Sequence, residues 1–407
     1  MKKSVLKEYA KLIVNVGANV QKGQEVQITA EMDQPEFVAY VAEACYKAGA
    51  KKVTVDWKND ALTKLNAKFQ KLNVLSTVEE WEKAKLQHMV DVCPCRIYIM
   101  SEDPDGLKGI SQPKYSKALA ARGKITRPYR QAIDNKHQWT IAAVPGEKWA
   151  KKVFPHLSKK QAVEALWEQI LSCARAEGDA VANWEAHNAQ MEKHAAFLNE
   201  KNIRKLHYKA SNGTDLTVGL MEQSRFCAAC DVTLGGVPYT PNMPTEEVFT
   251  TPKKGEAEGI VYSSMPLSYQ GQLIDKFCLE FKDGKVVSAK AEVNEALLQR
   301  MVEMDENAGY LGECALVPKE SPINQSGLIF YNTLFDENAS CHLALGMGYD
   351  SCVKDFDKYT REELAEMGVN DSVIHVDFMI GTDDMTITGS TEAGEEFKIF
   401  ENGTWAF

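Results

Sequence analysis

Side chains that can bind a metal ion or donate a proton gather between residues 247 and 377 of the chain. Most of them stand in apolar or glycine-rich segments, where burying an ionisable group costs free energy unless its charge is compensated. A divalent cation, or a pair of cations, is the usual compensation. These residues are Glu247, Glu313, Glu337, His342, Tyr349, His375 and Asp377. Their types and surroundings predict a metal-dependent hydrolase.

The strongest single pattern is the segment 373–380, Val-Ile-His-Val-Asp-Phe-Met-Ile, which predicts a strand. Residues two apart in a strand point to the same face, so His375 and Asp377 should project side by side. An imidazole and a carboxylate placed in this way can bind one cation or two neighbouring ones. A hydrogen-bonded His–Asp pair on a solvated strand face would give the same short pattern, and the segment alone does not separate the two.

The segment 334–349 brings Glu337, His342 and Tyr349 close together in the sequence. His342 precedes an apolar run, and a lone histidine there is most often a hydrogen-bonded core residue. The nearby Glu337 and the glycines at 346 and 348, which allow close approach of the backbone, favour a site instead. Tyr349 could donate a hydrogen bond to an oxyanion. A half-buried tyrosine with a purely structural role would give the same sequence pattern.

Two further carboxylates are candidate ligands. Glu313 lies in the apolar run 311–318, and a buried glutamate without a partner would be protonated or destabilising. Glu247 is the second of two adjacent acids in a short, proline-framed segment, 241–252. Paired glutamates are usually surface charge, so this segment is weak on its own.

Other metal-like or nucleophilic patterns are set aside. Cys227 and Cys230 have metal-ligand spacing, but no second Cys or His pair follows at a suitable distance. They also lack the strand-to-helix context of a redox motif. No phosphate-binding, dinucleotide or serine-hydrolase motif occurs. The remaining histidines lie among charged or polar residues and are predicted at the surface: His88, His137, His156, His187, His194 and His207.

The two halves of the chain have different patterns of predicted secondary structure. Residues 1–200 alternate helix and strand patterns, with strands expected at 25–30, 52–57, 96–100 and 139–144. This order predicts an α/β N-terminal domain with a mostly parallel sheet, ending in a bridging helix at 183–200. Residues 201–407 carry short alternating runs and hairpin turns such as Asp283-Gly284. They predict a β-rich α+β C-terminal catalytic domain that contains the metal-binding residues, with helices near 292–304 and 360–367.

Composition excludes several classes of protein. The net charge of −10 over 407 residues argues against a nucleic-acid partner. The 10 cysteines occur mostly in apolar contexts and indicate a reduced, cytoplasmic protein without a disulfide framework. The first residues predict an amphipathic helix rather than a signal peptide, and no segment approaches the ~20 apolar residues that a membrane span requires.

Taken together, segments 242–250, 311–317, 336–346 and 375–381 resemble the thermophilic-type metalloaminopeptidases, the family of aminopeptidase T and aminopeptidase S. The resemblance implies a pair of divalent ions, with Zn, Co, Mn or Mg as candidates. The matching ligands would be Glu247, Glu313, His342, His375 and Asp377. Glu337 would be a further ligand or a neighbouring group, and Tyr349 the matching tyrosine. The segment 226–238 differs from the usual sequence of the family. Because this segment should border the cleft, the substrate preference stays open.

The resemblance implies an aminopeptidase that releases N-terminal residues from short peptides with a free N-terminus. It also implies a homodimer with its sites facing a shared chamber. Water activated by two metal ions would attack, with Glu313 as ligand and candidate base, and Tyr349 as donor to the oxyanion. One alternative is a two-metal phosphoesterase, although the expected clusters of Asp, Asn and basic residues are missing. The other is a non-catalytic metal- and peptide-binding protein.

Overall fold

The computed structural model describes residues 1–407, and the chain divides into two compact units. The first unit comprises Met1–Trp184 and Cys230–Pro244, and the second comprises Glu185–Ala229 and Thr245–Phe407. Helix α9 (Ala180–Glu200) begins in the first unit and ends in the second. The sequence pattern predicts two domains, residues 1–200 and 201–407. This division stays a prediction.

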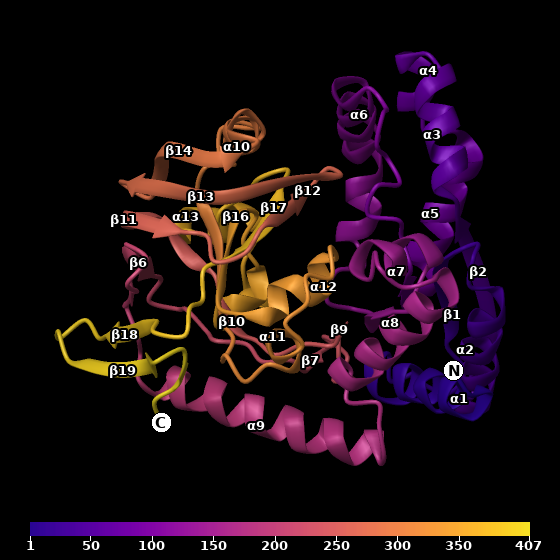
Figure 1. Cartoon of the computed structure of the whole chain (residues 1–407), viewed down its shortest axis with the longest axis horizontal. Helices are drawn as coiled ribbons and strands as arrows, with labels where there is room; N and C mark the ends of the chain where they lie inside the picture. Colours follow the sequence, from indigo (N-terminus) through magenta and orange to yellow (C-terminus); the bar gives the residue numbers. More distant parts are fainter. The chain divides into compact units, whose positions relative to one another are not determined.

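The first unit is built on a parallel sheet with the strand order β2-β1-β3-β4-β9. The predicted alternation of strands and helices is confirmed, and Figure 1 shows these elements in indigo to magenta. Its strands are β1 (Glu25–Glu31), β2 (Lys52–Lys58), β3 (Cys95–Met100), β4 (Trp139–Ala143) and β9 (Asn242–Met243), with a small hairpin of β7 (Asp231–Val232) and β8 (Pro238–Tyr239). Its helices are α1 (Lys3–Leu12), a π-helical turn (Ile13–Gly17), α2 (Pro35–Ala48), α3 (Asp60–Phe69), α4 (Leu72–Ser76), α5 (Glu80–Val92), α6 (Gln112–Gln131), α7 (Glu147–Val153) and α8 (Lys159–Cys173).

Local sequence explains where these elements begin and end. Helix α2 starts with Pro35 in its first turn, where the missing backbone N–H is not needed. It ends at Gly49, whose φ of 101° lies in the left-handed region that glycine adopts without strain. On β1 the apolar Val26, Ile28 and Ala30 alternate toward the core. The period-two pattern therefore predicts the buried face correctly.

The second unit contains two antiparallel sheets. The larger, nine-stranded sheet runs β12-β13-β11-β6-β5-β18-β19-β20, with β14 paired to β13. Its strands are β5 (Lys205–Lys209), β6 (Asp215–Leu220), β11 (Pro252–Tyr262), β12 (Leu267–Tyr269), β13 (Gln272–Lys282), β14 (Lys285–Val293), β18 (Thr386–Ser390), β19 (Glu396–Glu401) and β20 (Thr404–Trp405). The smaller, four-stranded sheet has the order β10-β15-β16-β17. It consists of β10 (Val248–Thr250), β15 (Leu311–Leu316), β16 (His342–Gly346) and β17 (His375–Met379).

Short helices connect the strands of the second unit. They are α10 (Glu295–Val302), α11 (Pro322–Gln325), α12 (Thr333–Asp336) and α13 (Arg361–Met367), with 3₁₀ turns at η2 (Glu337–Ala339), η3 (Asp350–Cys352) and η4 (Phe356–Lys358). Helices α10 and α13 fall within the two helical segments predicted from the sequence. The predicted fold class, α/β followed by β-rich α+β, is thus confirmed.

One apolar face of the four-stranded sheet packs into the largest core cluster of the second unit. Leu343, Leu345 and Phe378 come from this sheet, and Phe277 comes from the nine-stranded sheet. The ring centroids of Phe277 and Phe378 lie 5.8 Å apart. Because side chains alternate along each strand, the opposite face of the small sheet is left for other residues.

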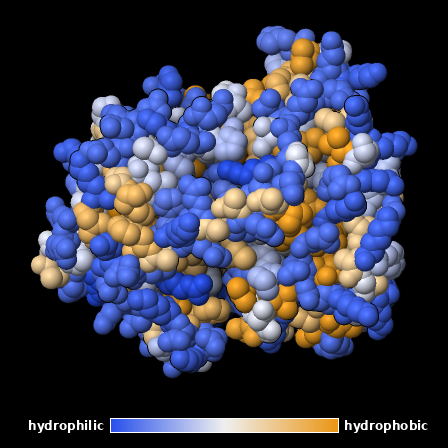
Figure 2. Space-filling model, turned by 90° about the horizontal axis from the view of Figure 1, so that it is seen from below, coloured by the Kyte–Doolittle hydropathy of each residue, from blue (hydrophilic) through white to orange (hydrophobic).

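The surface of the molecule agrees with the composition. Hydrophilic side chains predominate on the face drawn in Figure 2, and apolar side chains are scattered among them in small groups. None of the helices combines the length and the hydropathy that a membrane-crossing segment requires.

Candidate metal centre

The face of the four-stranded sheet that points away from the core carries the predicted site residues. On β17, His375 and Asp377 alternate with Val376 and Phe378, as the period of two predicts. Asp377 is paired in register with Ala344 of β16, and Ala344 is also paired with Glu313 of β15. A small side chain therefore separates the positions of two carboxylates.

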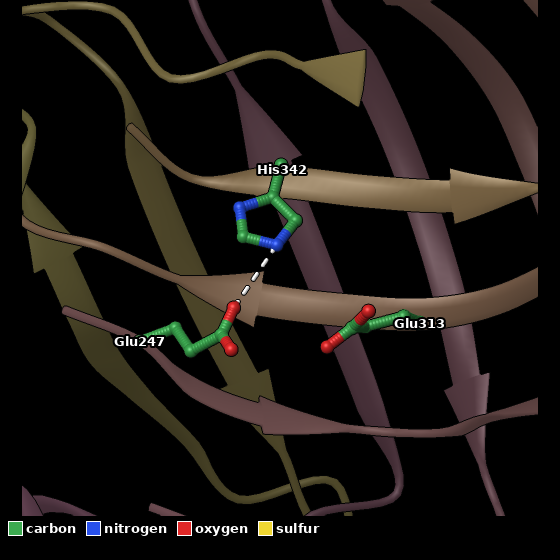
Figure 3. A group of neighbouring side chains, drawn as sticks. All are labelled: Glu247, Glu313 and His342. Atoms are coloured by element: carbon green, nitrogen blue, oxygen red, sulfur yellow. Dashed lines mark ion pairs between the residues drawn. The ribbon is translucent and has the colours of Figure 1, made fainter. Parts of the chain in front are cut away.

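The first cluster consists of Glu247, Glu313 and His342, whose possible ligand atoms all lie within 4.8 Å of one another. Figure 3 shows the imidazole of His342 and the two carboxylates converging from neighbouring strands. Nε2 of His342 lies 3.1 Å from Oε2 of Glu247, and both side chains are at least nine-tenths buried. Glu247 reaches the cluster because it immediately precedes β10, the edge strand paired with β15.

The second cluster consists of Glu313, His375 and Asp377, again with ligand atoms within 4.8 Å of one another. Nε2 of His375 lies 3.1 Å from Oε2 of Glu313 and 3.1 Å from Oδ1 of Asp377. Glu313 belongs to both clusters, so the two groups adjoin at this carboxylate.

Backbone carbonyls orient both histidines. Nδ1 of His375 lies 2.7 Å from the carbonyl oxygen of Met347, and Nδ1 of His342 lies 3.3 Å from that of Ser340. A ring N–H donated to a carbonyl fixes the tautomer and leaves Nε2 with a free lone pair. In both residues it is Nε2 that faces the carboxylates, which is the arrangement that metal-binding histidines use.

Burial and mutual repulsion perturb the carboxyl groups. Burial raises the pKa of Glu313 to about 7, and the nearby charge of Glu247 adds to that rise. Burial also raises the pKa of Glu337 well above its usual range, reinforced by the charges of Asp377 and Glu247. Burial opposes the ionised form of Asp377, but the charge and hydrogen bond of His375, together with the charge of His342, outweigh it and lower the pKa of Asp377.

The pKa values of both histidines are raised as well, because carboxylates surround them. Burial would lower the pKa of His342, but the hydrogen bond and the charge of Glu247 raise it to about 10. Burial likewise opposes the charged form of His375, whereas Asp377 and Glu313 raise its pKa well above the usual range. The carboxylates thus outnumber the imidazoles, and this buried group of side chains needs additional positive charge.

These residues fit divalent cations. Oδ1 of Asp377 is buried and has no hydrogen-bond partner, although Nε2 of His375 lies nearby. An orphaned, ionised oxygen in a buried site is costly unless a cation or donor satisfies it. Carboxylate oxygens together with imidazole nitrogens are donors that Zn²⁺, Co²⁺ and Mn²⁺ accept.

Two predicted residues lie at the edge of this arrangement. Glu337 opens the turn η2 and accepts a long 3.4 Å hydrogen bond from Nδ2 of Asn338, but its ligand atoms belong to neither compact cluster. The hydroxyl of Tyr349 lies 3.1 Å from Nε2 of His375, and its ring packs against Phe249. Tyr349 is therefore in contact with the second cluster, while Glu337 lies near enough to both clusters for their charges to shift its pKa.

Two residues that position the candidate ligands are not identified from the sequence. Asn338 is fully buried; its Oδ1 accepts the backbone N–H of Glu246 at 2.7 Å, and its Nδ2 donates to the carbonyl of Leu334. These bonds fix the segment that carries Glu247. Ala344 is the second, because it leaves room between Glu313 and Asp377. The only available sequence signal is that each stands within a segment already chosen for its metal ligands.

The prediction that the remaining histidines lie at the surface is wrong for two of them. His137 and His187 are buried, with 6% and 9% of their surface exposed. Their rings contact the backbone carbonyls of Ile133 and Thr245, respectively. Charged neighbours in sequence point to other sides of a helix or turn, so they do not report on the burial of the histidine itself.

Comparisons with known proteins identify the family of this chain. The family model described as thermophilic metalloprotease (M29) matches residues 2–405. Aminopeptidase AmpS of Bacillus subtilis is 43% identical over 404 residues, covering 99% of this chain and 98% of that protein. Aminopeptidase PepS of Streptococcus thermophilus is 40% identical, with 99% and 98% covered.

Solved structures give the same result. The chain superposes on wild-type AmpT from Thermus thermophilus with a TM-score of 0.92, 35% identity and full coverage of both chains. A 2,5-dihydroxypyridine dioxygenase from Pseudomonas putida, at 11% identity and a TM-score of 0.50, is similar in fold alone. Because the family model and the relatives span nearly the whole chain, this protein belongs to the thermophilic metalloprotease (M29) family, the metal-dependent aminopeptidases.

Proposed function

We propose that this chain releases N-terminal residues from short peptides with a free N-terminus, using a water molecule activated by two divalent metal ions. The observation that carries the proposal is the pair of adjoining clusters that share Glu313. Two ligand sets joined by one carboxylate are the arrangement that a pair of neighbouring ions requires. The substrate class is supported by relatives that are named aminopeptidases.

The ligands are assigned from the two clusters. Glu247, Glu313 and His342 would bind one ion, while Glu313, His375 and Asp377 would bind the other. Glu337 would be a further ligand or would support one through its charge. Zn²⁺, Co²⁺, Mn²⁺ and Mg²⁺ are the candidate ions, because mixed oxygen and nitrogen sites accept several divalent metals. When bound, the ions would supply Lewis-acid activation of the water and of the scissile carbonyl.

Two residues are assigned roles in moving protons. Glu313 would take the proton that the attacking water gives up and pass it to the leaving amine, because it belongs to both ligand clusters and so lies beside the water. Tyr349 would donate its hydroxyl hydrogen to the oxyanion that forms on the scissile carbonyl. The enclosed position of its hydroxyl and the surrounding carboxylates raise the pKa of Tyr349, although part of its ring is exposed.

The larger assembly is also a proposal. Residues 1–200 would form the α/β N-terminal domain and residues 201–407 the catalytic domain of a cytoplasmic homodimer. The free thiols of the cysteines support a reducing compartment. The two sites would face a shared chamber that admits only short or unfolded peptides. Sedimentation equilibrium should give twice the mass of the chain, and a monomer mass would refute the dimer.

The first test uses metal-stripped protein with a leucyl anilide and its N-acetylated counterpart, with and without added Co²⁺, Mn²⁺ or Zn²⁺. We expect added metal to restore cleavage of the substrate with the free amine only. Cleavage of both substrates would mean that the amine is not recognised. Cleavage of neither under any of the metals would reject the proposed activity.

A matched pair of histidine variants tests the ligands. His342→Ala should reduce turnover at least roughly 10²-fold, because even residues that merely support metal ligands cost about 10- to 100-fold when removed. His207→Ala is the control, since His207 is exposed on β5 and bonded only to Asp215 at 2.7 Å. Equal turnover in the two variants would remove His342 from the site.

A further inference from the structure

On strands β3 and β4 of the parallel sheet, one face is buried and the other is only half-covered. On β3, the side chains of the second face are Arg96, Tyr98 and Met100, and all three are half-buried. Trp139 and Ile141 continue this face on β4. Parallel sheets are normally covered on both faces. Here the second face borders a cavity of about 470 Å³, closed on one side by the C-terminal end of α6 and the turn after it.

Two arginines without carboxylate partners line this cavity. Arg96 projects from β3, and its guanidinium lies 5.0 Å from the centre of the Tyr98 ring. Its Nε is buried and has no hydrogen-bond partner. Arg130 approaches from the last turn of α6 and forms no ion pair. A buried guanidinium donor without an acceptor costs free energy, so an acceptor from outside the chain would stabilise this arrangement.

Both guanidinium groups lie close enough to the Tyr98 hydroxyl to shift its pKa. Burial raises the pKa of Tyr98, and the charges of Arg96 and Arg130 oppose that rise, which places both charges near the Tyr98 hydroxyl. Two arginine forks beside a phenol make a group of donors suited to a planar or tetrahedral anion. In a chain with a net charge of −10, two unpaired arginines facing one cavity are a specific feature.

The acidic residues of the lining do not neutralise this pair. Glu102 forms its ion pair with Lys58, at 3.7 Å. Asp134 lies beside His137, whose pKa it raises while burial lowers it. The charge facing the Tyr98 hydroxyl therefore stays positive.

Apolar side chains form another part of the wall. Trp139, Ile141 and Met100 from the sheet face Ile133 from the turn after α6. The volume lies within the range of ~300–1,000 Å³ that small-molecule sites occupy. An apolar cleft with a few convergent polar donors is the usual form of such a site.

We infer that this cavity is a ligand site for a small molecule that carries one carboxylate or phosphate group on an aromatic or apolar body. Arg96, Arg130 and the Tyr98 hydroxyl hold the anionic group. Trp139 and Ile141 contact the body. All residues of this site belong to the first unit, and it shares none with the metal centre, whose residues belong to the second.

Titration calorimetry on the wild-type protein tests the site with three probes of similar shape: 3-phenylpropionate, phenyl phosphate and the uncharged 3-phenylpropionamide. Each anion that fits should bind at least about tenfold more tightly than the amide, as charge-assisted hydrogen bonds to arginine require. The tighter of the two anions identifies the anionic group that the site prefers. Binding of the amide equal to that of both anions, or no binding of either anion, would overturn the inference.

The double variant R96Q/R130Q locates the binding. It should lose about tenfold or more of its affinity for the anion, while the weak binding of the amide stays unchanged. Arg300 is an exposed arginine on α10, and Arg300→Gln is the matched control. This control should bind the anion as tightly as the wild type does. Circular dichroism and thermal unfolding of each variant report whether it is folded. If the double variant does not fold, Tyr98→Phe should weaken the anion alone by a few-fold. Unchanged anion affinity in a folded variant would place the binding elsewhere.

Discussion

At the scale of single residues, the hydroxyl of Tyr349 is the neutral donor that reaches the second cluster, at 3.1 Å from Nε2 of His375. A donor aimed at developing charge contributes to the transition state more than to substrate binding. Tyr349→Phe should therefore lower kcat by roughly 10²-fold and change KM little. Steady-state kinetics on a leucyl anilide measure this effect, and metal analysis of the variant should show an unchanged metal content. A kcat within twofold of the wild type would contradict the assigned role.

Glu31, at the end of β1, gives a prediction about pH. Burial raises its pKa to about 7, with added repulsion from Glu102 and Asp60. A carboxyl group whose pKa rises on folding stabilises the fold below its unfolded pKa, and this contribution is lost as the pH rises through 7. Glu31→Gln should therefore raise Tm at pH 8 by on the order of 2 °C or more and give no gain at pH 5.

Thermal unfolding at the two pH values, followed by circular dichroism, measures that difference. Glu280→Gln, at an exposed position on β13, is the control and should show the same small change at both pH values. A gain for Glu31→Gln of equal size at pH 5 and pH 8 would mean that the charge of Glu31 is not its cause.

At the scale of elements, the end of β16 depends on Gly346. Its φ of 103° is strained for any residue with a side chain, and a Cβ there would lie 2.1 Å from the carbonyl oxygen of Ile374. Because Gly346 is paired in register with His375, this clash would displace the strand that carries two ligands. Gly346→Ala should destabilise the protein by more than about 2 kcal/mol and weaken metal binding.

Gly327 supplies the matched control for this substitution. Its φ of 65° is also positive, but a Cβ there meets nothing within 4 Å. Gly327→Ala should cost only the backbone strain, about 1 kcal/mol, and leave turnover unchanged. Urea unfolding together with metal titration separates the two variants. Similar losses in both would show that strain alone, and not the contact with β17, accounts for the effect.

The elements also explain which parts of the site could be predicted from the sequence. The pairing of His375 with Asp377 follows from the period of a single strand, which is local. The approach of Glu247 to His342 depends instead on which strands neighbour one another in the small sheet, and nothing within either segment specifies that order. The same limit applies to Ala344, whose small size matters only after the registers of β15 and β17 are known.

At the scale of the whole molecule, the metal centre should be linked to stability. An ion that binds only the folded protein stabilises it by about 2.7 kcal/mol when present at a hundred times its dissociation constant. Removing metal from the wild type should lower Tm, and adding Co²⁺, Mn²⁺ or Zn²⁺ should restore it. Glu313→Gln should abolish this response, since Glu313 belongs to both clusters.

Differential scanning fluorimetry with and without a chelator measures the response. Glu280→Gln again serves as the control and should respond as the wild type does. A variant at Glu313 that still gains Tm with added metal would show that the stabilising ions bind elsewhere.

The strand His342–Gly346 has a wider consequence for how this protein can vary. Its leucines at 343 and 345 lie in the core that the two sheets of the second unit share, whereas His342, Ala344 and Gly346 occupy the opposite face. Within these five consecutive residues, those that pack in the core alternate with those that face the candidate metal centre. A substitution of Leu343 or Leu345 therefore acts on packing, whereas one of His342, Ala344 or Gly346 acts on the candidate metal centre.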